Sequence, residues 1–185
     1  TCALPISTQD DMPGYLSLVP TQLSQCLDAG DEVVAALRAL SAILVGGAAT
    51  NQQLLTRALD AGLRVRTTYG MTETAGGCVY DDLPLPGTSV RAVDWDGRTR
   101  LAINGPTLMT RYLDAESPFF DEGGHRWLLT GDMGIIRASG TVEVRGRADD
   151  VIVSGGLSVA PGPVRRAVRS YDGISDAWIM ATPDA

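Results

Sequence analysis

The chain has 185 residues, 44% of them hydrophobic, and a formal net charge of -7. This length allows one large domain or two small ones with their own cores, and the acidic balance argues against binding of nucleic acid or an anionic membrane. All 15 basic residues are arginine, and no apolar run approaches the roughly 20 residues that a membrane-spanning helix requires.

Helices and strands are predicted to alternate in the first part of the chain, because apolar residues recur there at helical spacing between short apolar runs. The predicted elements are a helix over 20–30, a helix capped by Asp31, a strand over Ala42–Val45, a helix capped by Thr50 or Asn51 and ended by Gly62, and a strand over Leu63–Thr68. A strand, a glycine turn, a helix and a second strand form the βαβ pattern of a parallel sheet. Ligands bind beyond the carboxyl ends of such strands, so we predict that the turns at Gly46 and Tyr69 lie on the same edge of the sheet.

The segment Tyr69–Thr74 follows the last of these strands and has the sequence Tyr-Gly-Met-Thr-Glu-Thr. Gly70 is predicted to allow a sharp turn that a residue with a Cβ would resist. Such a turn presents a flat ring for a base, the Thr72 hydroxyl for phosphate oxygens and the Glu73 carboxylate for a hard cation such as Mg²⁺. The alternative is a strand that ends in an ordinary glycine turn with a solvated glutamate.

Short antiparallel strands are predicted from residue 86 onward, where the spacing of apolar residues changes. Asp96-Gly97 is a strong signal for a two-residue hairpin turn, and Ser139-Gly140 predicts a second hairpin. We therefore predict a small antiparallel barrel or sheet over residues 86–146.

Two breaks are predicted within this antiparallel part. Residues 107–126 are expected to be irregular, with His125 as a loop residue. The strand that starts at Trp127 is expected to end at Thr130-Gly131-Asp132.

The last part of the chain is predicted to begin a separate α+β unit, with a hairpin after Val151, a helix from Pro161 and a strand over 174–180. We expect three domains: an α/β part over 1–85, an antiparallel β subdomain over 86–147, and a hinge with the beginning of a small C-terminal domain over 148–185.

Two polar residues in the second half are candidates for nucleotide binding. Asp132 can accept hydrogen bonds from both hydroxyls of a ribose, and bonds to a charged group contribute about 1.5–3 kcal/mol each. A turn aspartate bonded to its own backbone is an equally good interpretation. Arg147 offers a fork of donors for ribose or phosphate oxygens, although a surface salt bridge is the more usual role of such a residue.

The order and spacing of these segments resemble one family, the adenylate-forming enzymes, which include acyl-CoA synthetases, adenylation domains of peptide synthetases and luciferases. Tyr69–Thr74 is similar to the family's Tyr-Gly-x-Thr-Glu signature, and Thr130-Gly131-Asp132 is similar to its Thr-Gly-Asp. Gly146–Asp149 resembles Gly-Arg-x-Asp. Gly155-Gly156 and Val159-x-Pro161 resemble the Gly-Gly and Val-x-Pro that follow it. Each motif is weak alone, but the ordered set is specific and covers most of the chain.

The resemblance implies a fold and a reaction. The implied fold is the C-terminal part of the large AMP-binding domain, a parallel α/β layer with a small antiparallel β-barrel, followed by the start of a small α+β domain. In the implied reaction a carboxylate attacks the α-phosphate of ATP, pyrophosphate leaves, and the thiol of CoA then takes the acyl group from the adenylate. The implied partners are thus a small-molecule carboxylate, ATP with Mg²⁺, and CoA.

The resemblance also implies roles for individual residues. Thr72 and Glu73 are the implied catalytic residues, with Thr72 at the α-phosphate and Glu73 as the magnesium ligand. Asp149 is the implied hinge between two half-reactions, and Gly155-Gly156 is the implied loop of the CoA channel. The implied nucleotide-binding residues are Gly46, Gly47, Ala48, Thr68, Tyr69, Gly70, Met71, Thr72, Asp132 and Arg147.

One segment suggests the acid. Ser17–Leu23, with the sequence Ser-Leu-Val-Pro-Thr-Gln-Leu, resembles a segment of the o-succinylbenzoate–CoA ligases of menaquinone synthesis. The short spacing between the motifs fits this branch as well. The alternatives are a fatty-acyl or aryl-CoA ligase, or a nucleotide-binding or interaction module without catalysis.

Several features of the family are absent from this sequence. Pro163 and Arg165 stand where the family usually has two glutamates, a departure that concerns the packing of the C-terminal part. The sequence has no Ser/Thr/Gly-rich phosphate loop ending in lysine, and it has no lysine at all. We therefore expect this chain by itself to form no acyl-adenylate.

The cysteines bear on the compartment. Cys2, Cys26 and Cys78 are far apart and odd in number, which favours reduced thiols and a cytoplasmic location. A homodimer is a further expectation, and binding of nucleic acid is not expected.

Overall fold

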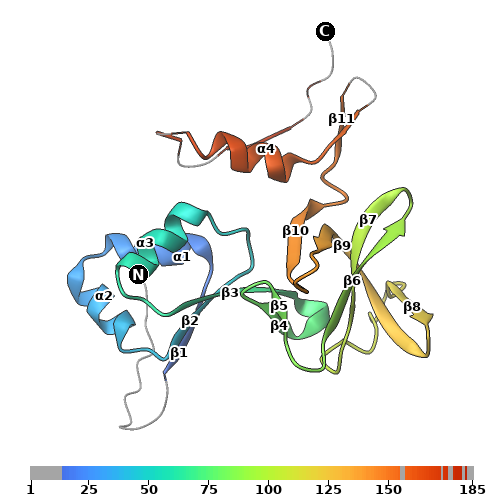
Figure 1. Cartoon of the computed structure of the whole chain (residues 1–185), viewed down its shortest axis with the longest axis horizontal. Helices are drawn as coiled ribbons and strands as arrows, with labels where there is room; N and C mark the ends of the chain where they lie inside the picture. The colour runs from blue at the N-terminus through green and yellow to red at the C-terminus, as the bar shows by residue number, and fades with distance from the viewer. Residues whose placement is uncertain (1–13, 155–156, 172, 175–176, 181, 183–185) are drawn as a thin grey trace. The chain divides into compact units, whose positions relative to one another are not determined.

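The structure, a computed structural model, describes residues 14–154, 157–171, 173–174, 177–180 and 182 (Figure 1). The chain divides into two compact units, Thr1–Asp82 and Leu83–Ala185. The first contains β1 (Tyr15–Leu18), α1 (Pro20–Asp28), α2 (Asp31–Arg38), β2 (Ala42–Val45), α3 (Gln52–Asp60), β3 (Val65–Met71), a 3₁₀ turn (Thr72–Thr74) and β4 (Gly76–Tyr80). The second contains β5 (Leu83–Pro84), β6 (Ser89–Trp95), β7 (Arg98–Asn104), β8 (Phe119–Glu122), β9 (His125–Ile136), β10 (Val142–Arg147), β11 (Ile152–Ser154), β12 (Leu157–Val159) and α4 (Pro161–Val168). The predicted mixed α/β fold class is confirmed, while the division into three domains stays a prediction.

A parallel sheet forms the framework of the first unit. β1 pairs with β2 and β2 pairs with β3 in parallel, with Leu18 opposite Val45 and Val45 opposite Thr67. The carboxyl ends of all three strands therefore lie at one edge, and the predicted βαβ pattern is confirmed. The sequence pattern does not reveal β1, because a strand of four residues is too short to establish an alternation.

The helices α1, α2 and α3 pack on one face of this sheet (Figure 1). Ile43 and Val45 point to the same side of β2, because alternate residues of a strand share a face. The helices contribute residues three or four positions apart to the same core. Its buried members are Leu18, Leu23, Cys26, Val34, Leu37, Ile43, Val45, Ala58 and Leu63. Burial of one such aliphatic side chain contributes about 1.5–3 kcal/mol, so this core stabilises the edge on which the strands end.

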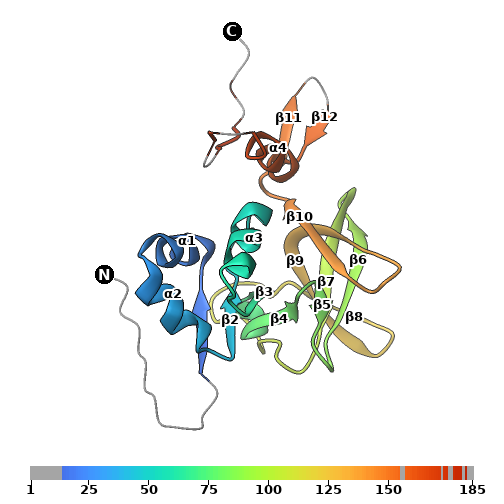
Figure 2. The same ribbon diagram turned by 60° about the vertical axis from the view of Figure 1, so that its left-hand side comes forward.

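The second unit is built on an antiparallel sheet with the strand order β10-β9-β7-β6, and β8 pairs with β9 (Figure 2). The hairpin between β6 and β7 turns at Asp96 and Gly97, whose φ angles are 53° and 71°. Two successive positive φ angles are typical of the type I′ turn that matches the twist of a hairpin. The predicted hairpins at Asp96-Gly97 and Ser139-Gly140 are both confirmed.

The predicted strand end at Thr130-Gly131-Asp132 is wrong, because β9 continues through these residues for a total of 12. Gly131 has no positive φ and does not break the strand. Its missing side chain instead leaves room for a neighbour, since a Cβ there would lie 2.6 Å from Arg147 Nη2. Thr130 is buried and donates to the Leu101 carbonyl across the sheet at 2.8 Å.

The prediction of irregular structure over residues 107–126 is wrong at its end, because Phe119–Glu122 forms β8 and His125 is the first residue of β9. Arginine–aromatic contacts, which sequence periodicity does not show, accompany this pairing. The Arg126 guanidinium lies 3.5 Å from the centre of the Phe119 ring, and it donates to the carbonyls of Met109 and Thr110. It thereby ties the preceding loop to the strand pair.

The last described elements are a β11–β12 hairpin and the helix α4 (Figure 2). The hairpin and the helix from Pro161 agree with the prediction. The predicted strand over 174–180 is wrong for its described residues, 174 and 177–180, which form no strand. Gly155 and Gly156, the predicted CoA-channel loop, lie outside the described residues.

Two leucines of the second unit offer a matched test of its core. Leu101 on β7 is fully buried, whereas the side chain of Leu113 is 88% exposed. Leu101→Ala should lower the free energy of unfolding by about 2–5 kcal/mol through lost burial and a residual cavity, and Leu113→Ala should change it by less than about 0.5 kcal/mol. All three tryptophans belong to this unit, so unfolding in urea followed by tryptophan fluorescence reports on it. Equal shifts in the two variants would contradict this placement of the core.

Candidate functional site

The sheet edge at which β2 ends is fixed by the close approach of Gly46 to Thr68 of β3. A Cβ on Gly46 would lie 2.1 Å from Thr68 Oγ1 and 2.9 Å from the Thr68 carbonyl oxygen, closer than any side chain tolerates. The Thr68 hydroxyl in turn lies 3.4 Å from the Val45 carbonyl oxygen, to which it donates. The segments that contain Gly46 and Tyr69 therefore lie on the same edge of the sheet, as predicted.

The loop after Gly46 leads directly into α3. Gly47 has a φ of 77°, a left-handed conformation that favours glycine. Asn51, rather than Thr50, is the residue that caps α3, because its side-chain oxygen accepts a hydrogen bond from the Gln53 amide at 2.8 Å. Gly46, Gly47 and Ala48 thus connect a buried strand to the start of a helix at the sheet edge, which is where the sequence places a nucleotide.

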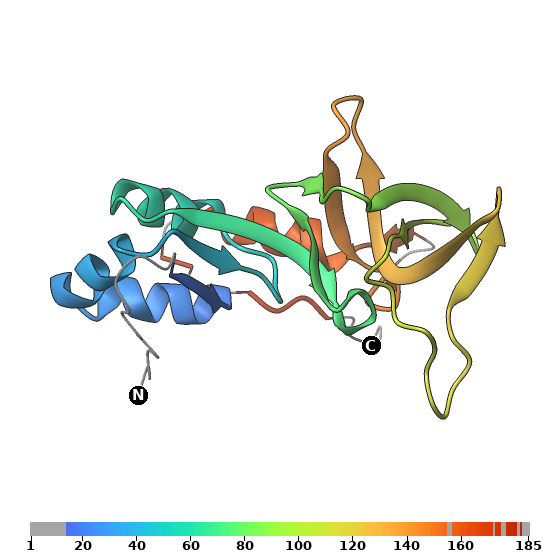
Figure 3. The same ribbon diagram turned by 90° about the horizontal axis from the view of Figure 1, so that it is seen from below.

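The predicted turn at Gly70 is wrong, because β3 runs without a break through Tyr69 and Gly70 to Met71 (Figure 3). Gly70 is needed for a different reason: a Cβ there would lie 2.0 Å from the Gly76 carbonyl oxygen on β4. The register of β3 and β4 shifts between Tyr69 and Gly70, so an irregular strand pair bends the segment at this point.

The reversal of the chain occurs at Thr72–Thr74, which forms a 3₁₀ turn. Thr72 is exposed and Glu73 is half-buried. Ala75 follows with a φ of 55°, a left-handed conformation that is strained for a residue with a side chain. A carboxylate and a hydroxyl are thus carried on a short, tightly bent segment directly beyond β3.

Thr74 is a residue of this turn that the sequence analysis does not single out as a site residue. Its side chain is only 1% exposed, and its hydroxyl accepts a hydrogen bond from the Met71 amide at 2.9 Å. A hydroxyl residue directly after the Thr-Glu pair is the only signal for it in the sequence. The neighbouring Cys78 is buried, and burial raises the pKa of its thiol despite the opposing hydrogen bond from Thr74, so this thiol stays protonated near neutral pH.

Glu73 fits a magnesium ion shared with a phosphate ligand. Among the described residues no group of three or more His, Cys, Asp and Glu side chains forms a metal cluster. Mg²⁺ in nucleotide sites is commonly held by one or two carboxylates, with phosphate oxygens and waters as its other ligands. A single carboxylate at the end of β3 is compatible with this kind of binding.

Asp132 and Arg147 lie together in the second unit. They are opposite each other in the β9–β10 pairing, and Arg147 Nη1 lies 3.7 Å from Asp132 Oδ1. Arg147 Nη2 also donates to Asp149 Oδ2 at 3.0 Å. The hydrogen bond that Arg147 donates to Asp149, together with the nearby negative charge of Asp132, outweighs partial desolvation and raises the pKa of Arg147, so this side chain stays charged.

The carboxylate and the guanidinium differ in their access to solvent. The side chain of Asp132 is 13% exposed and that of Arg147 is 54% exposed. Asp132 lies within β9, so the interpretation of it as a turn aspartate is wrong. A fixed acceptor beside a solvent-accessible fork of donors suits a ribose diol and its phosphate.

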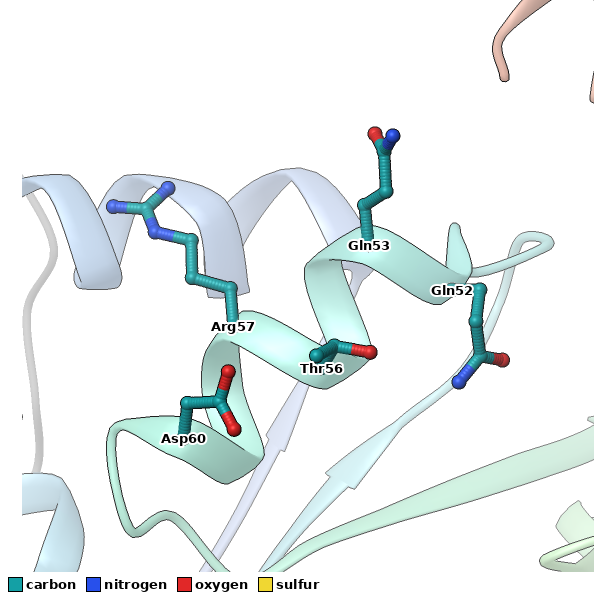
Figure 4. Close-up of a pocket in the computed structure, with 5 residues that line it drawn as sticks. All are labelled: Gln52, Gln53, Thr56, Arg57 and Asp60. Atoms are coloured by element: carbon teal, nitrogen blue, oxygen red, sulfur yellow. The ribbon is translucent and has the colours of Figure 1, made fainter.

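A hollow on the first unit lies along the outer side of α3. It is lined by Gln52, Gln53, Thr56, Arg57 and Asp60 (Figure 4). None of the predicted nucleotide-binding residues lines it, so it does not coincide with the sheet edge.

Residues 9–113 of the chain match the family of AMP-binding enzymes. Because this match spans more than half of the chain, the chain belongs to that family. The family resemblance drawn from the ordered sequence motifs is thereby confirmed.

Relatives within the family include 2-succinylbenzoate–CoA ligases. The chain is 40% identical over 173 residues to a probable 2-succinylbenzoate–CoA ligase of Mycobacterium tuberculosis, an alignment that covers 92% of this chain and 44% of the relative. It is 30% identical over 184 residues to a 2-succinylbenzoate–CoA ligase of Lactococcus lactis, covering 92% and 38%. The chain therefore spans less than half the length of these relatives.

Solved structures of o-succinylbenzoate CoA synthetases are similar to this chain. The o-succinylbenzoate CoA synthetase of Bacillus subtilis, in complex with its acyl-adenylate intermediate, superposes with a TM-score of 0.76 at 26% identity, over 93% of this chain and 39% of that one. The same enzyme in complex with ATP and a magnesium ion gives a TM-score of 0.72, over 88% and 38%.

Gly46→Ala tests the close approach at the sheet edge. The added methyl group should force β2 and β3 apart and lower the free energy of unfolding by about 1–3 kcal/mol, the usual range for overpacking. Thr68→Ala removes the nearer obstacle, so the double variant should lose less than the sum of the two single variants. Thermal unfolding followed by far-ultraviolet circular dichroism measures all three. Strictly additive losses would show that Gly46 and Thr68 do not constrain each other.

Proposed function

We propose that the protein containing this chain is an ATP-dependent, AMP-forming acid–CoA ligase whose acid is o-succinylbenzoate. The observation that carries the proposal is the arrangement at the end of β3, where Thr72 and Glu73 follow the sheet edge that Gly46 and Thr68 form. A hydroxyl, a carboxylate and accessible backbone at the carboxyl ends of parallel strands are suited to a nucleotide with its magnesium ion. Family membership and the similarity to 2-succinylbenzoate–CoA ligases support the same reaction.

The reaction has two steps. In the first, a carboxylate oxygen of the acid attacks the α-phosphorus of ATP, the bond to the bridging oxygen breaks, and pyrophosphate leaves with its electron pair. In the second, the thiol of CoA attacks the acyl carbon of the adenylate, loses its proton, and displaces AMP. The acid is thereby converted to a thioester at the cost of one phosphoanhydride bond.

The first step depends on groups that stabilise negative charge around the α-phosphate. Thr72 donates its hydroxyl to an α-phosphate oxygen, and Glu73 holds the magnesium ion. When bound, that ion neutralises charge on the phosphate oxygens. Tyr69 would lie near the adenine, and Gly46, Gly47 and Ala48 would line the adenine and acyl site.

Asp132 accepts from the ribose hydroxyls, and Arg147 donates to ribose or phosphate oxygens. Within β9 and β10 the two side chains are held in register, and the Asp132 carboxylate is already mostly buried. This fixes the acceptor before the nucleotide arrives, which lowers the entropy lost on binding.

The second step requires a change of conformation, for which we propose Asp149 as the hinge. It lies two residues after the end of β10 and precedes the β11–β12 hairpin, so rotation of its backbone would move everything after it. The Gly155-Gly156 loop is proposed to line the CoA channel.

The choice of o-succinylbenzoate rests on the relatives and on Ser17–Leu23. This segment joins β1 to α1 at the same edge of the sheet, where the Leu18 carbonyl accepts a hydrogen bond from the Gly46 amide at 3.2 Å. The test is carboxylate-dependent exchange of labelled pyrophosphate into ATP by the complete gene product, with o-succinylbenzoate, a fatty acid and an aryl acid compared at equal concentration. Preference for either of the other acids would overturn the substrate assignment. Absence of acid-dependent exchange with all three acids would overturn the function.

The proposal extends to a cytoplasmic location and a homodimer. In the part of the chain that the structure describes, no helix is long and apolar enough to cross a membrane. Cys26 and Cys78 are buried cysteines outside any disulfide, a state that suits a reducing compartment.

Glu73→Gln tests the magnesium ligand. In the complete gene product this change should slow pyrophosphate exchange by about 10²–10³-fold, because it removes a charge that stabilises the reacting phosphate, an effect of about 2.7–4 kcal/mol. The melting temperature should change far less than the rate, since Glu73 is only half-buried on a short turn. Glu32→Gln, which changes an exposed glutamate of α2 in the same way, is the matched control and should leave the rate unchanged. A normal rate in the Glu73 variant would mean that Glu73 is not a magnesium ligand.

Asp149→Pro tests the hinge. Proline fixes φ, so the variant should retain pyrophosphate exchange but lose most of its thioester formation. Asp149→Ala is the control, because it removes the ion pair with Arg147 and leaves the backbone free to rotate. Equal losses in both half-reactions, or the same defect in the alanine variant, would count against a backbone hinge.

A further inference from the structure

Thr74 is a buried residue whose side-chain hydroxyl forms hydrogen bonds with backbone groups on both sides of the turn. Its side chain is 1% exposed. The hydroxyl accepts from the Met71 amide at 2.9 Å and lies 2.7 Å from the Gly76 carbonyl oxygen and 3.0 Å from the Met71 carbonyl oxygen. A hydroxyl has one proton, so it donates to one acceptor at a time, and the Gly76 carbonyl is the nearer of these two. When the hydroxyl donates to Gly76, its oxygen links Met71 before the turn to Gly76 after it.

The turn that this hydroxyl closes carries Thr72 and Glu73. A 3₁₀ turn of three residues has few backbone hydrogen bonds of its own, and here the Ala75 amide donates to the Thr72 carbonyl at 3.1 Å. Ala75 is held with a φ of 55°, which is unfavourable for alanine. Such strain persists only where the surroundings fix the backbone, and the Thr74 hydroxyl is a side-chain group inside the turn that does so.

The base of the turn is rigid for a second reason. β3 and β4 approach so closely at Gly70 and Gly76 that no side chain fits between them. The backbone on both sides of the turn is therefore fixed by strand pairing, and the hydroxyl of Thr74 ties the remaining residues to that pair.

We propose that Thr74 is a positioning residue, whose hydroxyl holds the Thr72–Thr74 turn so that the Thr72 hydroxyl and the Glu73 carboxylate are already oriented for the α-phosphate and its magnesium ion before ATP binds. This inference rests on the proposed function. Preorganised groups act on the transition state without a cost of reorganisation. A loose turn would hold the same two side chains in many orientations, so magnesium would bind more weakly and the chemical step would be slower.

The experiment compares Thr74→Val with Thr74→Ser in the complete gene product. Valine keeps the shape of threonine and removes the hydroxyl, whereas serine keeps the hydroxyl. Pyrophosphate exchange is measured as a function of Mg²⁺ concentration, well below each variant's own melting temperature. We expect Thr74→Val to lower kcat by about tenfold, the effect of one lost hydrogen bond, and to raise the Mg²⁺ concentration for half-maximal rate severalfold. Thr74→Ser should behave as the unaltered protein.

Leu37→Val is the control for a general loss of stability, because Leu37 is a buried residue of α2 in the same unit and is remote from the turn. It should lower the melting temperature without changing the Mg²⁺ dependence. If Thr74→Val does not fold, Thr74→Ala replaces it. The rate at which the Met71 amide hydrogen exchanges with solvent is then measured as well, since loss of the hydroxyl should expose that amide.

The outcomes separate the two proposals. An unaltered protein without acid-dependent exchange overturns the proposed function. An active protein in which the valine or alanine variant keeps the normal Mg²⁺ dependence, or in which serine fails to restore it, overturns the positioning role of Thr74 and leaves the function standing. A shifted Mg²⁺ dependence that serine restores and Leu37→Val does not show supports the inference.

Discussion

The geometry of the first unit depends on the approach of Gly46 to Thr68. Gly46 and Thr68 come so close that only a glycine fits at position 46, and the Thr68 hydroxyl donates a hydrogen bond to the Val45 carbonyl. The parallel register from Leu18 through Val45 to Thr67 brings the strand ends to this edge. The hydrophobic core beneath α1–α3 keeps them there, because moving one strand would disturb the burial of the others.

β3 changes its partner along its length, and this change creates the site. Its first residues pair in parallel with β2, and its last residues pair antiparallel with β4. The strand therefore extends past the sheet edge and places the Thr72–Thr74 turn beyond it. The close packing of Gly70 on Gly76 and the buried hydroxyl of Thr74 restrict that turn from two sides. A segment with a left-handed alanine is stable there because its surroundings leave it little freedom.

In the second unit, too, a glycine leaves room for a close neighbour, which here is a charged side chain. Gly131 leaves space for the guanidinium of Arg147, and strand pairing places Arg147 opposite Asp132. The exposed ion pair with Asp149 contributes little to stability, as is usual for accessible charges. In the proposed ligase this ion pair connects the arginine that is proposed to bind the nucleotide to the residue at which the backbone is proposed to rotate.

The sequence by itself determined the family, the βαβ pattern and the two hairpin turns. It also determined the candidate residues near the end of β3 and those on β9 and β10. These features depend on local properties: helical spacing in α1–α3, turn residues such as Asp96-Gly97, and short motifs whose order is specific. Only the tertiary structure decided what the glycines do. Gly70 and Gly131 look like turn residues in the sequence, yet both lie within strands, where they admit a neighbouring backbone or side chain. The role of Thr74 was hidden for the same reason. A close approach or a buried hydrogen bond is made with residues that pairing and packing bring near, and no single stretch of sequence contains that information.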